Sequence, residues 1–153
     1  MCRNDKIKSI IVDICKTSKL SARHGAIITK GSSRVIFTGK NQERSRYGNC
    51  NVPSMHAEMV VVNKIINHLR KQFFNKQQIE RIMSKYTLWV GRITRDDNIA
   101  NSMPCSDCLK KLKKIGIKRI GFSNENGDFV ICNINQLTNN HLSKAQRDCI
   151  NLF

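Results

Sequence analysis

Two short segments of the chain carry side chains that can bind a metal ion. They are His56-Ala57-Glu58 and, further along, Pro104-Cys105-Ser106-Asp107-Cys108. Zinc binds imidazole nitrogen and thiolate sulfur, and a catalytic zinc site uses three protein ligands and leaves the fourth position to water. His56, Cys105 and Cys108 supply such a set of three. The two segments together predict a catalytic Zn2+ site.

Glu58 stands two residues after His56. Residues with this spacing do not face each other in a regular helix, so the two side chains can converge only at an irregular first turn. In that position Glu58 would not be a ligand. It could take a proton from the metal-activated water and deliver it to a substrate ring nitrogen and then to a leaving amine.

The Cys-x-x-Cys spacing lets both sulfurs reach one ion from the first turn of a helix, where the helix N-terminus stabilises thiolates. In a layered α/β sheet, helices that follow strands begin at the same edge of the sheet, where clefts form. We therefore expect the His56 and Cys105 segments to meet at that edge.

Other interpretations of these residues stay open at this stage. A Cys-x-x-Cys pair can be a redox pair or half of a structural zinc site, and a closed structural site needs a fourth protein ligand. The candidates for that ligand are Cys50, His24, His68 and His141. The cysteines outside the motif fall in apolar patterns and are expected to be core residues; they are Cys2, Cys15, Cys132 and Cys149.

The elements that must position these residues follow from apolar periodicity and turn residues. Apolar side chains at helical spacing predict a helix over the first 15 or so residues. Short apolar runs at 26–28 and 35–37 flank a glycine turn and predict a β-hairpin. The polar segment 42–53 is expected to be a loop, after which Ser54 could cap a helix that begins near Met55.

The remaining elements alternate along the chain. The predicted elements are a helix at Lys76–Met83, a strand at Tyr86–Ile93, a helix at Leu109–Ile115, a strand at Arg119–Ser123, a tight turn at 124–127, an antiparallel strand at Phe129–Ile134 and a closing helix at Ser143–Phe153. This order predicts one α/β domain over residues 1–153, a three-layer α/β/α sandwich with one mixed, about five-stranded sheet.

Composition limits the partners. No apolar run is long enough to span a membrane and no secretory signal precedes the first helix, so we expect a soluble, cytoplasmic protein. The net charge of +16 suits a nucleic-acid partner or a phosphorylated substrate, but the abundance of Ile, Lys and Asn also suits an AT-rich gene. The basic run from Lys110 to Arg119 is interpreted as a solvated helix face, with a phosphate contact as the alternative.

Aromatic residues could stack on a nucleobase. Trp89 lies in a strand pattern, and Phe73 and Phe74 lie at a helix end, so we expect these three to pack in the core. Tyr47 lies in the predicted loop and remains a candidate for substrate binding.

The paired motifs resemble the cytidine deaminase-like superfamily of zinc nucleoside and nucleobase deaminases, whose signature is H-x-E followed by P-C-x-x-C. The resemblance implies a Zn2+ cofactor, Glu58 as the proton shuttle, and a dimer or tetramer. It also implies that the Ala57 N–H contacts a base carbonyl and that Asn41 contacts the substrate sugar or base.

Branch markers within this superfamily are mixed. A histidine as the first ligand resembles the deoxycytidylate, transfer-RNA adenosine and polynucleotide cytidine branches, whereas an antiparallel last strand resembles the free-cytidine branch. The preferred interpretation is deamination of a cytosine-type base in a free nucleoside or nucleotide. The alternatives are a base within tRNA or single-stranded nucleic acid, with arginines 44, 46, 92 and 95 on phosphates, and a catalytically silent scaffold.

Overall fold

The computed structural model describes residues 3–31, 33–47 and 50–138, and describes only the backbone of residues 3, 43–47 and 50–54. The helices are α1 (Arg3–Lys16), α2 (Ala57–Lys71), α3 (Lys76–Met83) and α4 (Ser106–Ile115), with a 3-10 turn η1 (Ile134–Gln136). The strands are β1 (Arg23–Lys30), β2 (Arg34–Lys40), β3 (Gln42–Tyr47), β4 (Cys50–Met55), β5 (Tyr86–Ile93), β6 (Ile99–Ala100), β7 (Arg119–Ser123) and β8 (Phe129–Asn133). The predicted closing helix at Ser143–Phe153, together with Cys2, His141 and Cys149, lies outside the described residues.

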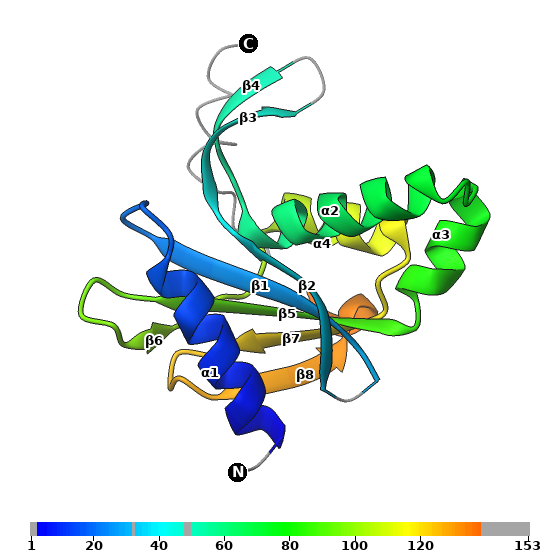
Figure 1. Ribbon diagram of the computed structural model, residues 1–153. Helices are drawn as coiled ribbons and strands as arrows, with labels where there is room; N and C mark the ends of the chain where they lie inside the picture. Colours follow the sequence, from blue (N-terminus) through cyan, green and yellow to red (C-terminus); the bar gives the residue numbers. More distant parts are fainter. Residues whose placement is uncertain (1–2, 32, 48–49, 139–153) are drawn as a thin grey trace.

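One mixed sheet organises the fold (Figure 1). Its strand order is β2-β1-β5-β7-β8, and the short β6 pairs with β5 as the sixth strand. The β5–β7 pair is parallel, and the other pairs in this sheet are antiparallel. Parallel strands need a crossover, which α4 provides between β5 and β7. The expectation of an α/β fold with one mixed sheet is confirmed.

Helices cover both faces of this sheet. Because successive strand residues point to opposite faces, Ala26 and Ile28 pack with α2, α3 and α4, whereas Ile27 packs with α1. In β5, Trp89 faces α1 in the same way. The arrangement is the three-layer α/β/α sandwich that the element order predicts.

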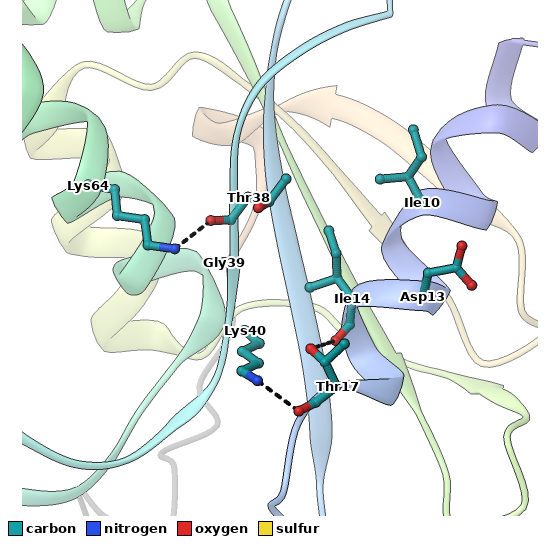
Figure 2. Close-up of a pocket in the computed structure, with 8 residues that line it drawn as sticks. All are labelled: Ile10, Asp13, Ile14, Thr17, Thr38, Gly39, Lys40 and Lys64. Atoms are coloured by element: carbon teal, nitrogen blue, oxygen red, sulfur yellow. Dashed lines mark hydrogen bonds between the residues drawn. The ribbon is translucent and has the colours of Figure 1, made fainter.

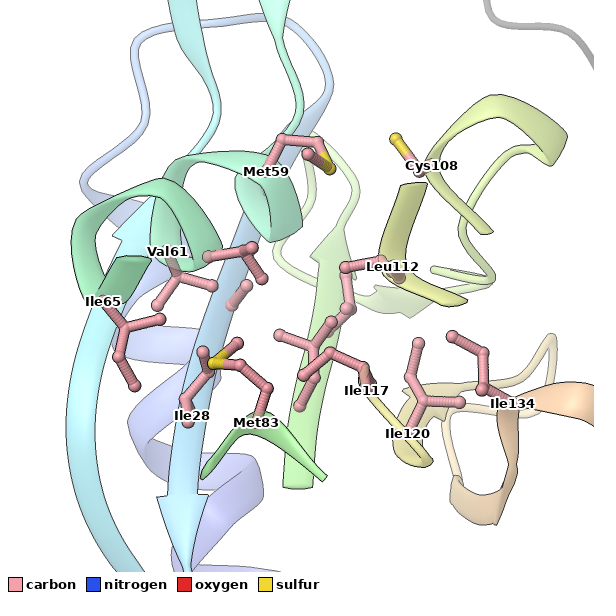
Figure 3. Close-up of a cluster of buried hydrophobic side chains, with 14 of the residues drawn as sticks. Ile28, Met59, Val61, Ile65, Met83, Cys108, Leu112, Ile117, Ile120 and Ile134 are labelled. Carbon is pink, nitrogen blue, oxygen red and sulfur yellow. The ribbon is translucent and has the colours of Figure 1, made fainter. Parts of the chain in front are cut away.

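The larger core cluster lies between the sheet and the three helices α2, α3 and α4. Figure 3 shows Met59 of α2 and Cys108 of α4 at one end of this cluster, and Ile28 and Met83 toward the other. The two helices therefore bring their N-terminal turns to the same end of the core.

Several predicted elements are confirmed with their bounds. The strands Tyr86–Ile93 and Arg119–Ser123 and the helix Lys76–Met83 begin and end where the pattern places them. For α3 the start has a clear cause, since the Asn75 side chain accepts from the Gln78 backbone N–H and the Gln78 side chain accepts from the Asn75 N–H. This reciprocal pair is a capping box.

The expected loop at 42–53 is wrong. Strands β3 and β4 form a separate two-stranded antiparallel hairpin there, with Gln42 opposite Met55 and Tyr47 opposite Cys50. Its polar composition hides the strands because neither face needs to be apolar in a hairpin outside the main sheet. The helix expected to begin near Met55 under a Ser54 cap begins instead at Ala57, with His56 as the N-cap.

The expectation for the three aromatic residues is corrected in part. Trp89 is 3% exposed, and its Nε1–H donates to Thr29 Oγ1 at 3.1 Å. Phe74 packs against the core, but Phe73 is 96% exposed and has a φ of 63°. Left-handed backbone at the end of α2 turns the Phe73 side chain away from the core.

Two further differences concern strand ends and packing. Strand β6 was not expected, and β8 ends at Asn133 because Ile134 starts the 3-10 turn and is buried.

Cys15 is buried against the sheet, as expected of a core residue. Among the described residues, none of the helices is long and apolar enough to cross a bilayer.

Candidate metal centre

The two helix starts supply the potential metal ligands. His56 is the N-cap of α2 and Cys105 is the N-cap of α4, and both have extended backbones with ψ of 147° and 165°. Neither side chain makes a capping hydrogen bond. Both side chains are therefore available to a ligand, and the positive ends of the two helix dipoles point at the same place.

The predicted ligands come together. The His56 Nδ1 atom lies 3.3 Å from Cys108 Sγ and 3.7 Å from Cys105 Sγ. The three ligand atoms all lie within 4.8 Å of one another, and the two cysteines are buried. Residues from separate helices thus form one compact nitrogen–sulfur cluster.

Glu58 lies beside the cluster, as its position in the first turn of α2 predicts. Its Oε1 atom is 3.8 Å from His56 Nδ1. The residue is only 3% exposed, and its Oε2 atom has no hydrogen-bond partner among the described residues. A buried carboxylate oxygen without a partner is costly unless a ligand or water meets it.

The segment that leads to Cys105 is held by two buried serines that the sequence analysis did not single out. Ser102 Oγ donates to the Val90 carbonyl at 2.8 Å, and Ser123 Oγ donates to the Ala100 carbonyl at 2.6 Å. The Ser102 N–H donates to the Ser123 carbonyl and the Ser123 N–H donates to Ser102 Oγ. This network fixes the start of α4 between β5 and β7. A small polar residue at a strand end is the only sequence signal for it.

Hydrogen bonds among His56, Cys105 and Cys108 shift the pKa values of all three side chains. Hydrogen bonding to Cys105 and then to Glu58 raises the pKa of His56 to about 10. Hydrogen bonding to Cys108 lowers the pKa of Cys105 to about 5, while the same bond and burial raise the pKa of Cys108. A divalent cation can replace these shared protons, because metal ligands bind in their deprotonated forms.

Burial raises the pKa of Glu58, but the hydrogen bond and charge of His56 outweigh burial and leave that pKa below its ordinary value. The hydrogen bond and charge of His56 thus favour the ionised form of the carboxyl group. An ionised carboxylate is a base that can accept a proton.

The cluster fits Zn2+. One imidazole and two cysteines are the donor set of a catalytic zinc site, which has three protein ligands. Among the residues whose side chains are described, no fourth histidine, cysteine or carboxylate joins the group. His24 is outside it, and His68 is exposed and tilted against Phe37.

The Cys50 side chain, the rival fourth ligand, lies outside the described residues. The same holds for the side chain of Tyr47, whose backbone pairs with Cys50 in the β3–β4 hairpin. Substrate binding by Tyr47 therefore stays a prediction.

Asn41 is buried next to the sheet end where β1 begins. Its Oδ1 accepts from Ser18 Oγ at 2.7 Å and from the His24 N–H at 3.0 Å, and its Nδ2 donates to the Ala22 carbonyl at 2.6 Å. These bonds hold the start of β1 in place. They leave one amide hydrogen of Asn41 for a substrate, so its predicted contact remains a prediction, as does that of the buried Ala57.

A groove of about 480 Å³ lies elsewhere, between α1 and the edge strand β2 (Figure 2). Lys40 Nζ donates to the Thr17 carbonyl across it, and Lys64 Nζ donates from α2 to the Thr38 carbonyl of β2. Its lining includes neither the cluster residues nor Glu58. The groove is therefore separate from the metal centre.

Two strand residues near the cluster were not recognised as part of one site with it. His24 of β1 and Arg92 of β5 are cross-strand partners. Burial lowers the pKa of His24 to about 4, with the charge of Glu58 opposing and those of Arg92 and His56 adding to the effect. The Arg92 Nε atom is buried and has no hydrogen-bond partner among the described residues. Strand alternation could have placed both residues on the face of Ala26.

Comparison with known proteins gives one family match and one similar solved structure. Residues 3–124 match the protein family described as the cytidine and deoxycytidylate deaminase zinc-binding region. The crystal structure of dCMP deaminase from the cyanophage S-TIM5 in apo form is similar with a TM-score of 0.46, at 19% identity over 78% of this chain and 84% of that chain. No curated protein matches the sequence significantly.

Proposed function

The chain belongs to the cytidine and deoxycytidylate deaminase zinc-binding family, and from this premise we propose that it hydrolyses the amino group of a cytosine-type base in a free nucleoside or nucleotide. The protein is a zinc-dependent hydrolytic deaminase. The observation that supports the proposed site best is the buried Glu58 carboxylate, 3.8 Å from the imidazole of the His-Cys-Cys cluster.

We propose that His56, Cys105 and Cys108 hold the metal. When bound, zinc supplies a water of lowered pKa as the nucleophile. The two helix N-termini stabilise the thiolates. Both cysteines are buried, which keeps solvent away from their sulfur atoms.

Glu58 moves the protons in this proposal. It takes a proton from the water whose oxygen attacks C4 and gives a proton to ring N3, so that the C4–N3 double bond opens. It then moves the second proton of that water to the exocyclic amine. The C4–N4 bond breaks, ammonia leaves, and cytosine plus water becomes uracil plus ammonia. The unpartnered Oε2 suits the first of these transfers, because a buried carboxylate oxygen without a partner can accept a proton.

A small substrate is favoured by the last strand. Strand β8 runs antiparallel to β7, from Phe129 opposite Ser123 to Asn133 opposite Arg119. By resemblance this arrangement is typical of deaminases of free cytidine. We propose that Asn41 and the Ala57 N–H contact the substrate.

A base within a polynucleotide is the second candidate, because the chain has a net charge of +16 and exposed lysines on α4. Salt dependence separates the two. Binding that neutralises about six phosphates weakens roughly a thousandfold between about 50 and 200 mM salt, whereas a mononucleotide that meets one or two cations responds mildly. A steep salt dependence of kcat/KM on short RNA, with no turnover of cytidine or its monophosphate, would contradict the proposal.

The substitution Glu58→Gln tests the proton shuttle. We expect kcat to fall at least about a hundredfold, since positioned acid–base groups contribute roughly 10² to 10⁴ in rate. Zinc content should remain near one per chain, because Glu58 is not a ligand. Ammonia release and metal analysis are measured on the same preparations, with the exposed Glu125→Gln as the matched control. Full activity in the Glu58 variant would exclude the mechanism, and a wild-type protein that binds zinc without turnover of any base would indicate the silent scaffold.

A further inference from the structure

The rim of the metal centre contains a guanidinium group whose partner is missing among the described residues. Arg92 lies in the middle of the sheet, where β5 pairs with β1 on one side and with β6 on the other. Its neighbours across these strands are His24 and Ala100. Strand β6 leads directly to the segment that positions Cys105.

Arg92 and His24 face the same side of the sheet as Glu58. In the β1–β5 register, the pairs Ala26–Val90 and Ile28–Leu88 belong to the core cluster under α2 and α4. The pair His24–Arg92 continues this alternation by one step toward the strand end, where the cluster lies. The charges of Glu58, Arg92 and His56 all contribute to the pKa of His24.

The positive charge of Arg92 has no negatively charged partner among the described residues, so an anion would be stabilised beside it. Its Nε atom is buried without a hydrogen bond, and among the described residues no carboxylate forms an ion pair with Arg92. A guanidinium whose Nε is withdrawn from water is stabilised by an acceptor, and phosphate matches the fork of donors of a guanidinium. The one nearby carboxylate with an unpartnered oxygen is Glu58, which the reaction uses.

We propose that Arg92 binds the phosphate of a nucleoside monophosphate and so selects phosphorylated substrate over the free nucleoside. This inference rests on the proposed function and narrows its substrate class. His24 is the cross-strand neighbour of Arg92, and Asn41 holds the backbone at His24 by accepting from the His24 N–H. A terminal phosphate carries nearly two negative charges at neutral pH.

A terminal phosphate suits this location better than an internal one. The buried Nε belongs to a residue near the end of β5, flanked by the paired strands β1 and β6. An internal phosphodiester would require a nucleic-acid strand to enter and leave past this recessed group. A monophosphate needs only one path to it.

The test compares kcat/KM for cytidine 5′-monophosphate with that for cytidine in the wild type, Arg92→Leu and Arg92→Lys. Arg92→Leu should lower the ratio of the two values by about 10- to 100-fold, the effect of losing a charged hydrogen-bonding group. Arg92→Lys should restore part of the ratio, because an ammonium binds phosphate as a point charge. The exposed Arg81→Gln on α3 is the control and should leave the ratio unchanged.

Binding supplies a readout that does not require turnover. Calorimetric titration of zinc-loaded Glu58→Gln should show tighter binding of cytidine monophosphate than of cytidine, and the added Arg92→Lys change should reduce that difference.

The assignment is wrong if the ratio of the two kcat/KM values in either Arg92 variant equals that of the wild type. It is also wrong if activity on both substrates falls equally. A wild type that prefers cytidine or RNA would also overturn it, while leaving the deaminase proposal intact. A protein that deaminates no cytosine substrate would refute the proposed function itself, and the calorimetric comparison would still report on Arg92. Should Arg92→Leu not fold, Arg92→Lys carries the test alone.

Discussion

At the scale of single residues, the chemistry depends on which side chains are buried next to one another. Cys105 and Cys108 are buried 3 positions apart, and His56 meets both from another helix. Glu58 is buried beside them, and the neighbouring His56 lowers its pKa. A carboxylate in this position has no role in a purely structural zinc site, which is why it favours catalysis over a scaffold.

The substitution Cys108→Ser should remove zinc. Serine cannot supply a thiolate, and the two remaining ligands leave a catalytic site below its usual three. We expect metal analysis to give well under one zinc per chain and deaminase activity to be lost. Cys132→Ser is the matched control, since Cys132 is partly buried in β8 and outside the cluster. A variant that kept a full zinc complement would show that Cys108 is not a ligand.

His24 should make folding stability depend on acid. Its pKa falls from 6.5 to about 4 in the fold, mainly through burial, so the unfolded chain binds the proton more readily than the folded one. The free energy of unfolding is then unaffected above about pH 6.5 and decreases as the pH falls from there toward 4. The loss is roughly 2 kcal/mol, allowing for screening of a partly exposed ring.

Urea unfolding at pH 7 and pH 5 measures this effect by comparison with His24→Asn. The asparagine variant should lose less stability between the two pH values than the wild type does. Metal loss at low pH affects both proteins alike, so it cancels in the comparison. Equal losses in the two proteins would show that His24 does not stay neutral in the fold.

At the scale of elements, close contacts fix how helices sit on the sheet. Gly91 of β5 lies directly under α1, where a methyl group would overlap the Ile11 side chain. Gly121 of β7 is in the same relation to Trp89. Glycine at these strand positions therefore reflects packing, because its missing side chain lets a neighbour approach the backbone.

The substitution Gly91→Ala should destabilise the fold by about 1 to 3 kcal/mol through overpacking between α1 and the sheet. The double variant Gly91→Ala/Ile11→Ala should lose less free energy of unfolding than the sum of the losses in the two single variants. The smaller side chain at position 11 makes room for the added methyl group. Thermal unfolding of the four proteins gives the coupling. Additive costs would mean that α1 does not rest on Gly91.

At the scale of the whole molecule, a metal bound at the proposed cluster would join segments that are far apart in the chain. One cluster joins the start of α2, which packs on β1 and β2, with the start of α4, which connects β5 to β7. A ligand that binds only the folded chain stabilises it by mass action. Metal and fold should therefore be coupled.

Removing zinc with a chelator should lower the midpoint of thermal unfolding. The change corresponds to about 4 kcal/mol when free zinc exceeds its Kd a thousandfold. Scanning calorimetry with and without zinc measures it, and the double variant Cys105→Ser/Cys108→Ser should show no zinc-dependent shift. An identical midpoint for both forms of the wild type would argue against a site built by folding.

The sequence alone determined several secondary-structure elements and the motifs of the proposed site. Apolar periodicity located α3, β5 and β7 with their bounds. The H-x-E and P-C-x-x-C motifs predicted a site at His56, Glu58 and the two cysteines, and the fold brings His56 and the cysteines into one cluster. These signals are readable because helix and strand periods, turn residues and ligand types depend on near neighbours in the chain. These signals did not predict the β3–β4 hairpin, because its sequence is largely polar and shows no apolar alternation of a strand.

Only the tertiary structure decided how distant residues meet. It brought the three ligand atoms within 4.8 Å, left one Glu58 oxygen buried without a partner, and paired His24 with Arg92 across two strands. It also turned Phe73 out of the core through a positive φ. Register between strands and burial of a given atom depend on contacts between segments far apart in sequence, so no local pattern contains them.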